Sequence, residues 1–202
     1  MLYTQTELSE IVCTRISHDL IGNIGALSGA LELIKESNNT LDEDTLKILD
    51  TAAETLKARQ KFFRIAFGLS TTHIEMQELL NICTDYLRTI GSRTADINLK
   101  VSGITSEISK ILCLCVMTGA EVCIKGGTVE VCVNKDNLQI SVVSDTKLAT
   151  NKLLVYQRIL DHQKPEENIS QYVQLLYLQK LIGEEIAMKL DYDDTKMILT
   201  IG

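Results

Sequence analysis

The sequence has a single proline and no tryptophan among its 202 residues, and aromatic residues make up only 4%. Because proline interrupts helices, its near absence leaves room for long uninterrupted helices. Basic runs are also missing, and the formal net charge is −7. This balance argues against nucleic-acid binding, which usually needs a basic patch, and against attachment to an anionic membrane surface.

Long hydrophobic runs are missing too. The longest, residues 111–117, is far too short to span a bilayer. The first ten residues have neither the basic nor the apolar stretch of a signal peptide. Hydrophobic residues nevertheless make up 45% of the chain, which is enough for a packed core. We therefore expect a soluble, cytoplasmic protein.

The six cysteines lack the spacing of a metal site. Cys13 and Cys83 are isolated, and the other four lie in apolar segments without a C-x-x-C pair or a neighbouring histidine. We expect all six to be reduced and to serve as small apolar side chains. No metal ligand set is predicted.

Residues 6–69 carry the pattern of a helical hairpin. Apolar residues recur at spacings of three and four, as on one face of an amphipathic helix. The polar segment 36–44 interrupts them, and a second stripe runs from residue 46 to residue 67. Two such helices cannot bury both apolar faces alone, so we expect dimerisation into a four-helix bundle. The first stripe comprises Leu20, Ile24, Leu27, Leu31 and Ile34.

The periodicity changes after residue 69. Alternating segments predict a strand near residues 97–101 and two β-hairpins, at 128–143 and 186–201. Helices are predicted at 73–89, 108–124, 148–160 and 169–182. Together these elements predict an α+β fold: a hairpin domain at 1–69, then at 70–202 an α/β sandwich with helices on one face of a largely antiparallel sheet.

His18 lies within the first predicted helix. At about 100° per residue, it falls roughly opposite Leu20 and Leu27 and so faces solvent. Three glycines share its face, although each costs a helix about 1 kcal/mol relative to alanine. Close helix packing within the fold would explain them, and so would a flat surface on which a partner approaches the imidazole. The three are Gly22, Gly25 and Gly29.

Asp19 gives this histidine a chemical context. An imidazole attacks phosphorus through an unprotonated nitrogen, and a carboxylate that accepts a hydrogen bond from the other nitrogen fixes the tautomer. Asp19 suits that role, although an ordinary solvated charge would look the same in sequence. A phosphoryl carrier needs little more than positioning. His18 and Asp19 are therefore the candidate catalytic residues, and a partner would supply an aspartate and Mg²⁺.

The His18-Asp19-Leu20 helix, a helical hairpin and an α+β domain together resemble a sensor histidine kinase. Such kinases commonly carry Thr or Asn at the fourth position after the histidine and Pro at the fifth, where this chain has Gly22 and Asn23. In kinases that Thr or Asn is linked to phosphatase activity toward the regulator. Gly22 cannot orient a water, so the resemblance leaves open whether this chain has phosphatase activity.

The nucleotide motifs of those kinases are missing. Residues 108–124 contain no asparagine, the segment after residue 143 lacks the Asp-x-Gly-x-Gly turn, and no glycine occurs between Asp145 and Gly183. Because glycines allow close backbone approach to phosphates, we expect a degenerate kinase-like domain with no ATP site, no bound cofactor and no autokinase activity.

A histidine-bearing hairpin with an emptied kinase domain is similar to the ChpT-type histidine phosphotransferases of alphaproteobacteria. The resemblance implies a homodimer in a multistep phosphorelay. It would accept a phosphoryl group on His18 from the receiver domain of a CckA-like hybrid kinase and pass it to CtrA-like and CpdR-like response regulators. The matching residues are His18-Asp19-Leu20-Ile21, Ala26-Leu27, Gly29, Glu32-Leu33-Ile34 and Gly126-Gly127.

Three alternatives remain: a divergent sensor kinase that still binds ATP, a non-catalytic module that sequesters regulators, and a phosphate carried on His73 or His162. Partner contacts are assigned from helical geometry, with Arg59 placed level with His18 because both lie about 20 residues from the turn near 37–41. The candidate docking residues are Arg15, Ile21, Gly22, Gly25, Gly29, Arg59 and Phe63.

Overall fold

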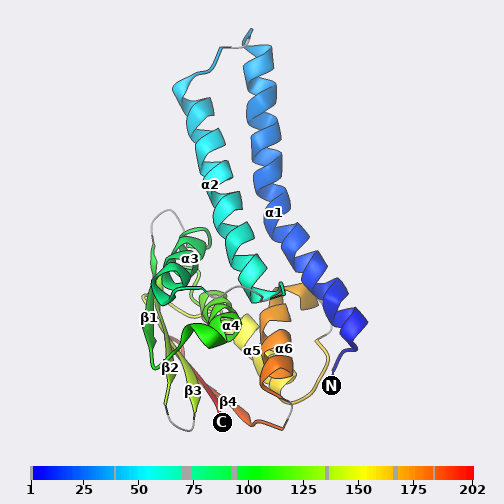
Figure 1. The fold of residues 1–202 in the computed structure, drawn as a ribbon, viewed down its shortest axis with the longest axis vertical. Coiled ribbons are helices and arrows are strands. Elements are labelled where there is room, and N and C mark those ends of the chain that lie inside the picture. Colours follow the sequence, from blue (N-terminus) through cyan, green and yellow to red (C-terminus); the bar gives the residue numbers. More distant parts are fainter. Residues whose placement is uncertain are drawn as a thin grey trace.

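The computed structural model describes residues 2–38, 40–69, 74–91, 95–134, 137–165, 168–183 and 185–202. Two long helices, α1 (Gln5–Glu36) and α2 (Glu43–Ala66), project together from an α/β unit (Figure 1). Thr4 and Glu7 form a capping box at the start of α1, and Asp42 caps α2. The predicted helical hairpin is confirmed.

The five strands form one mixed sheet in the order β1-β2-β3-β5-β4. β1 pairs with β2 in parallel, and the other neighbours are antiparallel. The predicted strand, both hairpins and the largely antiparallel sheet are therefore confirmed. The strands are β1 (Ile97–Ser102), β2 (Gly127–Val133), β3 (Leu138–Ser144), β4 (Met188–Tyr192) and β5 (Lys196–Ile201).

Helices pack on one side of this sheet (Figure 1). α4 is buried without a break from Leu112 to its end, which explains a sequence that is apolar on most sides. It ends earlier than predicted, because the chain turns through Gly126 and Gly127, both at positive φ, to enter β2. The helices are α3 (Met76–Arg88), α4 (Ser109–Ala120), α5 (Thr150–Leu160) and α6 (Val173–Ile182), with 3-10 turns η1 at Ser106–Ile108 and η2 at Ile169–Tyr172.

One continuous hydrophobic core joins the base of the hairpin to the α/β unit. Phe62 of α2 is fully buried and stacks on Tyr86 of α3, with ring centroids 3.6 Å apart and planes at 5°. Aromatic burial on this scale contributes several kcal/mol. The hairpin is therefore held against the α/β unit by packing, and the predicted domain division at residue 69/70 stays a prediction.

All six cysteines are free; four are buried, and Cys13 is exposed. Burial raises the pKa of the Cys123 thiol to about 12 and keeps it protonated. Among the described residues, no group of three or more His, Cys, Asp or Glu side chains is placed to hold a metal ion. Over the same residues, no helix is long and apolar enough to cross a membrane.

Candidate functional site

His18 stands on the outer surface of α1, midway along the helix. Its side chain is 76% exposed, so the predicted solvent-facing position is confirmed. It borders a shallow hollow together with Cys13, Thr14, Ser17 and Ile21. An exposed imidazole beside a shallow hollow is accessible to the surface of another protein.

The imidazole has one partner in the described structure, the neighbouring carboxylate. His18 Nδ1 lies 3.3 Å from Asp19 Oδ1, the arrangement that the sequence suggested. When Nδ1 carries the proton and donates a hydrogen bond to Asp19, Nε2 of the neutral ring keeps its lone pair. The geometry therefore leaves Nε2 as the ring nitrogen that is free to act as a nucleophile.

Two arginines also hold Asp19 in place. Its side chain is only 14% exposed, and its Oδ2 accepts a hydrogen bond from Arg15 Nε at 2.7 Å. Arg59 of α2 donates to the backbone carbonyl of Asp19 and also bonds Thr89 at the end of α3, through Nε to Oγ1 at 3.2 Å and Nη2 to the carbonyl at 2.9 Å. The predicted level placement of Arg59 beside this part of α1 is confirmed.

Two of the predicted docking residues lie inside the protein. Arg15 is only 5% exposed. Its side chain lies about 60° around α1 from His18, on the face that packs against η2 and α6. Phe63 is 3% exposed and packs with Phe67 and Tyr86. The assignment of Arg15 and Phe63 to the exposed docking face is therefore wrong.

The glycine face is open. A Cβ added at Gly22, Gly25 or Gly29 meets no other atom within 4 Å, so packing within this chain does not require any of the three. Ile21, beside them, is 63% exposed. The three glycines therefore leave a strip without side chains that extends from His18 along α1, with the exposed Ile21 side chain beside it.

Sequence reasoning missed Glu121, which follows α4 and is 7% exposed. Its Oε1 accepts from Arg15 Nη2 at 2.5 Å, and its Oε2 pairs with Lys152 of α5. Burial alone would raise the pKa of Glu121, but Arg15 and Lys152 outweigh it and hold the pKa below its usual range. One signal was present: Glu121 is the single charged residue in the segment 111–124.

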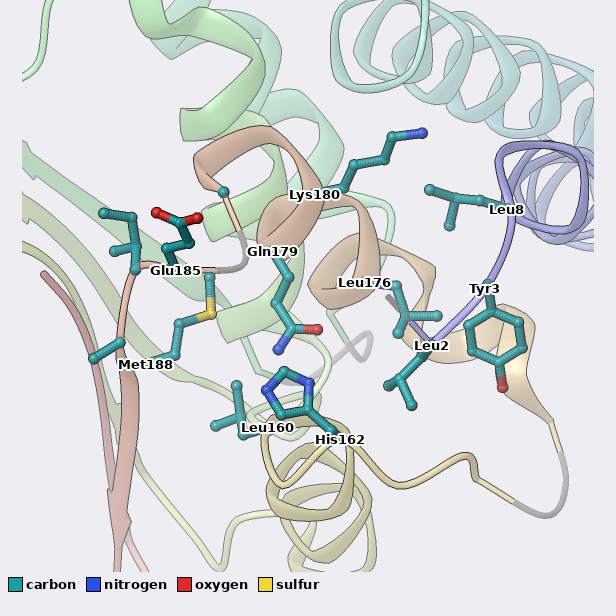
Figure 2. Close-up of a pocket in the computed structure, with 13 residues that line it drawn as sticks. Leu2, Tyr3, Leu8, Leu160, His162, Leu176, Gln179, Lys180, Glu185 and Met188 are labelled. Atoms are coloured by element: carbon teal, nitrogen blue, oxygen red, sulfur yellow. The ribbon is translucent and has the colours of Figure 1, made fainter.

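The alternative phosphate carriers lie elsewhere. His73 falls outside the described residues. His162 adopts a positive φ of 58° after α5 and lines a pocket of about 260 Å³ between the start of α1, α6 and β4. Figure 2 shows the His162 ring beside Gln179, and Met188 lines the same pocket. Among the described residues that line this pocket, Gly183 is the single glycine, so they form no glycine face like that beside His18.

No family model matches the sequence. The protein phosphotransferase ChpT of Brucella abortus (strain 2308) is 27% identical over 195 residues, which cover 94% of this chain and 91% of that protein. A solved structure of a bacterial phosphotransferase superposes with a TM-score of 0.77 at 22% identity and covers 99% of this chain and 98% of its own. The histidine kinase AdeS of Acinetobacter baumannii covers 91% of this chain and 95% of its own at a TM-score of 0.46 and 16% identity. The chain is therefore ChpT-like in sequence over nearly its whole length, and its fold is that of a bacterial phosphotransferase.

Proposed function

We propose that this protein is a histidine phosphotransferase of a multistep phosphorelay. It accepts a phosphoryl group from the aspartate of one receiver domain onto Nε2 of His18 and passes it to the aspartate of another. The observation that carries this proposal is the exposed imidazole whose Nδ1 faces Asp19 beside an open glycine surface. The likeness to a protein phosphotransferase supports the same reading.

The chemistry needs no proton transfer at the carrier. The Nε2 lone pair of His18 forms a bond to phosphorus while the bond between phosphorus and the donor aspartate oxygen breaks, and that electron pair leaves with the donor carboxylate. The phosphorylated ring keeps its Nδ1 proton and becomes positively charged. Asp19 stabilises that charge through the Nδ1 hydrogen bond. Transfer to the acceptor reverses these steps, and the receiver domains supply Mg²⁺.

The phosphoryl group comes from another protein under this proposal. The sequence lacks the asparagine and the glycines with which histidine kinases bind ATP. The buried carboxylate that follows α4 is already paired with Arg15 and Lys152.

We further propose that two copies form a four-helix bundle. Of the predicted α1 stripe, Leu20 packs against the core cluster, whereas Ile24 and Leu31 remain 47% and 52% exposed. α2 adds Leu46 and Ile48, which are 43% and 42% exposed. A second copy would bury these side chains, as bundle helices normally do. The proposed relay partners are the receiver domain of a CckA-like hybrid kinase and CtrA-like and CpdR-like regulators.

Phosphate transfer from a receiver tests the function. The full chain is mixed with a phosphorylated receiver domain and Mg²⁺, and it should acquire phosphate that is labile in acid and stable in base. His18→Ala should abolish the labelling, while His162→Ala, the matched control, should retain it. Labelling of His18→Ala at the wild-type level would overturn the proposal, and labelling by ATP alone would show a divergent kinase instead.

A further inference from the structure

A buried chain of charges connects the α/β unit to the imidazole. It runs from Asp19 through Arg15 of α1 to Glu121 after α4 and Lys152 of α5. We propose that Arg15, Glu121 and Lys152 are positioning residues, which hold the Asp19 carboxylate so that it selects the reactive tautomer of His18. This inference rests on the proposed function and assigns a role in the transfer to the α/β unit.

The Arg15 guanidinium lies at the centre of this row of buried charges and donates hydrogen bonds to three acceptors. Arg15 Nε donates to Asp19 Oδ2 at 2.7 Å, Nη2 to Glu121 Oε1 at 2.5 Å, and Nη1 to the carbonyl of Gln171 at 3.1 Å. Because guanidinium nitrogens are fixed in one plane, three partners leave the group no freedom to turn. Asp19 Oδ2 is therefore anchored, and Oδ1 remains directed toward His18.

The charges of Glu121 and Lys152 complement those of Asp19 and Arg15. Glu121 receives Lys152 on its second oxygen, so the two carboxylates face two cations. A buried charge without its partner costs several kcal/mol, whereas a complete set with good geometry is tolerated. Removing Lys152 or Glu121 would therefore leave an excess charge beside Arg15 and disturb its grip on Asp19. Two further groups border the chain: Tyr86, whose pKa is raised chiefly by burial, and Arg59, on the Asp19 carbonyl.

The chemical consequence concerns one proton. A fixed Asp19 Oδ1 keeps the proton of His18 on Nδ1 and leaves Nε2 unprotonated for attack. If Asp19 turned freely, the ring would return to the tautomer mixture of a solvated histidine. The same carboxylate would then be misplaced when positive charge develops on the ring. In metal sites, residues that orient a ligating side chain contribute about 10–100-fold to metal affinity or activity, and we expect an effect of similar size here.

Two measurements on the full chain test the assignment. The ¹⁵N signals of the His18 ring, assigned by their loss in His18→Ala, report the tautomer, and labelling by a phosphorylated receiver reports the transfer rate. Arg15→Met, which removes the anchor of Asp19, should increase the Nε2-protonated tautomer and slow transfer about tenfold or more. Arg15→Lys keeps the charge but loses the planar guanidinium, so it should restore neither the wild-type tautomer of His18 nor the wild-type transfer rate.

Lys152→Met tests the remote end, and because the Lys152 side chain is 16% exposed, this change is milder if Arg15→Met does not fold. It should shift both readouts in the same direction, while Arg158→Met, exposed on the same helix, should shift neither. Variants that are less stable but keep the wild-type tautomer and transfer rate per folded molecule would overturn the assignment. The tautomer measurement needs no phosphate donor, so it still decides the positioning role if the proposed transfer itself fails.

Discussion

Replacing the three glycines beside His18 by alanine should make the protein more stable and, at the same time, slow phosphoryl transfer to His18. Glycine inside a helix is less favourable than alanine by about 1 kcal/mol, and a Cβ at each position meets nothing within 4 Å. The triple variant of Gly22, Gly25 and Gly29 should therefore gain about 3 kcal/mol. For a chain of this length, that gain raises Tm by roughly 6–12 °C.

Transfer should change in the opposite direction. Three methyl groups on the smooth face of α1 would keep the surface of a receiver farther from Nε2 of His18. A misplacement of about 1 Å can slow a positioned reaction on the order of 100-fold. The rate of labelling by a phosphorylated receiver measures this loss, and thermal unfolding followed by circular dichroism measures the gain.

The two readouts can refute the reasoning separately. An unchanged or lower Tm would mean that helical glycines do not destabilise α1 as calculated. A higher Tm with transfer at the wild-type rate would mean that the glycine face does not receive the receiver domain. Ser28→Ala, an exposed position on the same helix, is the control and should alter stability by no more than about 0.5 kcal/mol.

Three further changes test the packing, the buried charges and the proposed dimer. Phe62→Ala removes the ring stacked on Tyr86 and should lower the free energy of unfolding by about 3–5 kcal/mol in urea; a loss below 1 kcal/mol would contradict the shared core. The pKa of Glu121 is lowered in the folded protein. Its contribution to the free energy of unfolding is therefore fully present above its unfolded pKa of about 4.3 and is lost as the pH falls through its pKa in the folded state. Urea unfolding of Glu121→Gln should therefore show a deficit of about 3–5 kcal/mol at pH 7 that shrinks below pH 4, and a constant deficit would refute this account. Leu31→Glu should shift the mass measured by light scattering from dimer to monomer, whereas Leu154→Glu, at an exposed position on α5, should not.

Periodicity predicted most of the fold, because the relevant spacings are local. The apolar stripes defined α1 and α2, and alternation defined both β-hairpins. The same information could not say which partner each apolar side chain meets. Leu20 packs against the core, but Ile24 from the same stripe remains exposed.

The site was predictable where its chemistry lies within adjacent residues. His18 and Asp19 are neighbours, and the glycine face follows from helical geometry alone. Arg15 was placed wrongly because η2 and α6, which cover this part of α1, and its partner Glu121, 106 positions away, are all distant in the sequence. A helical wheel shows the direction of a side chain from its own axis, but it does not show which other element approaches from that direction.

The stacking of Phe62 on Tyr86 bears on any attempt to exchange parts between relatives. A chimaera joined at residue 69 would pair this hairpin with a foreign α3, and the 3.6 Å ring contact would have to form between side chains that were never matched. Exchange of residues 1–91 as one block keeps α1, α2 and α3 together. Chimaeras of this second kind should fold more often, because their junction lies beyond the aromatic pair.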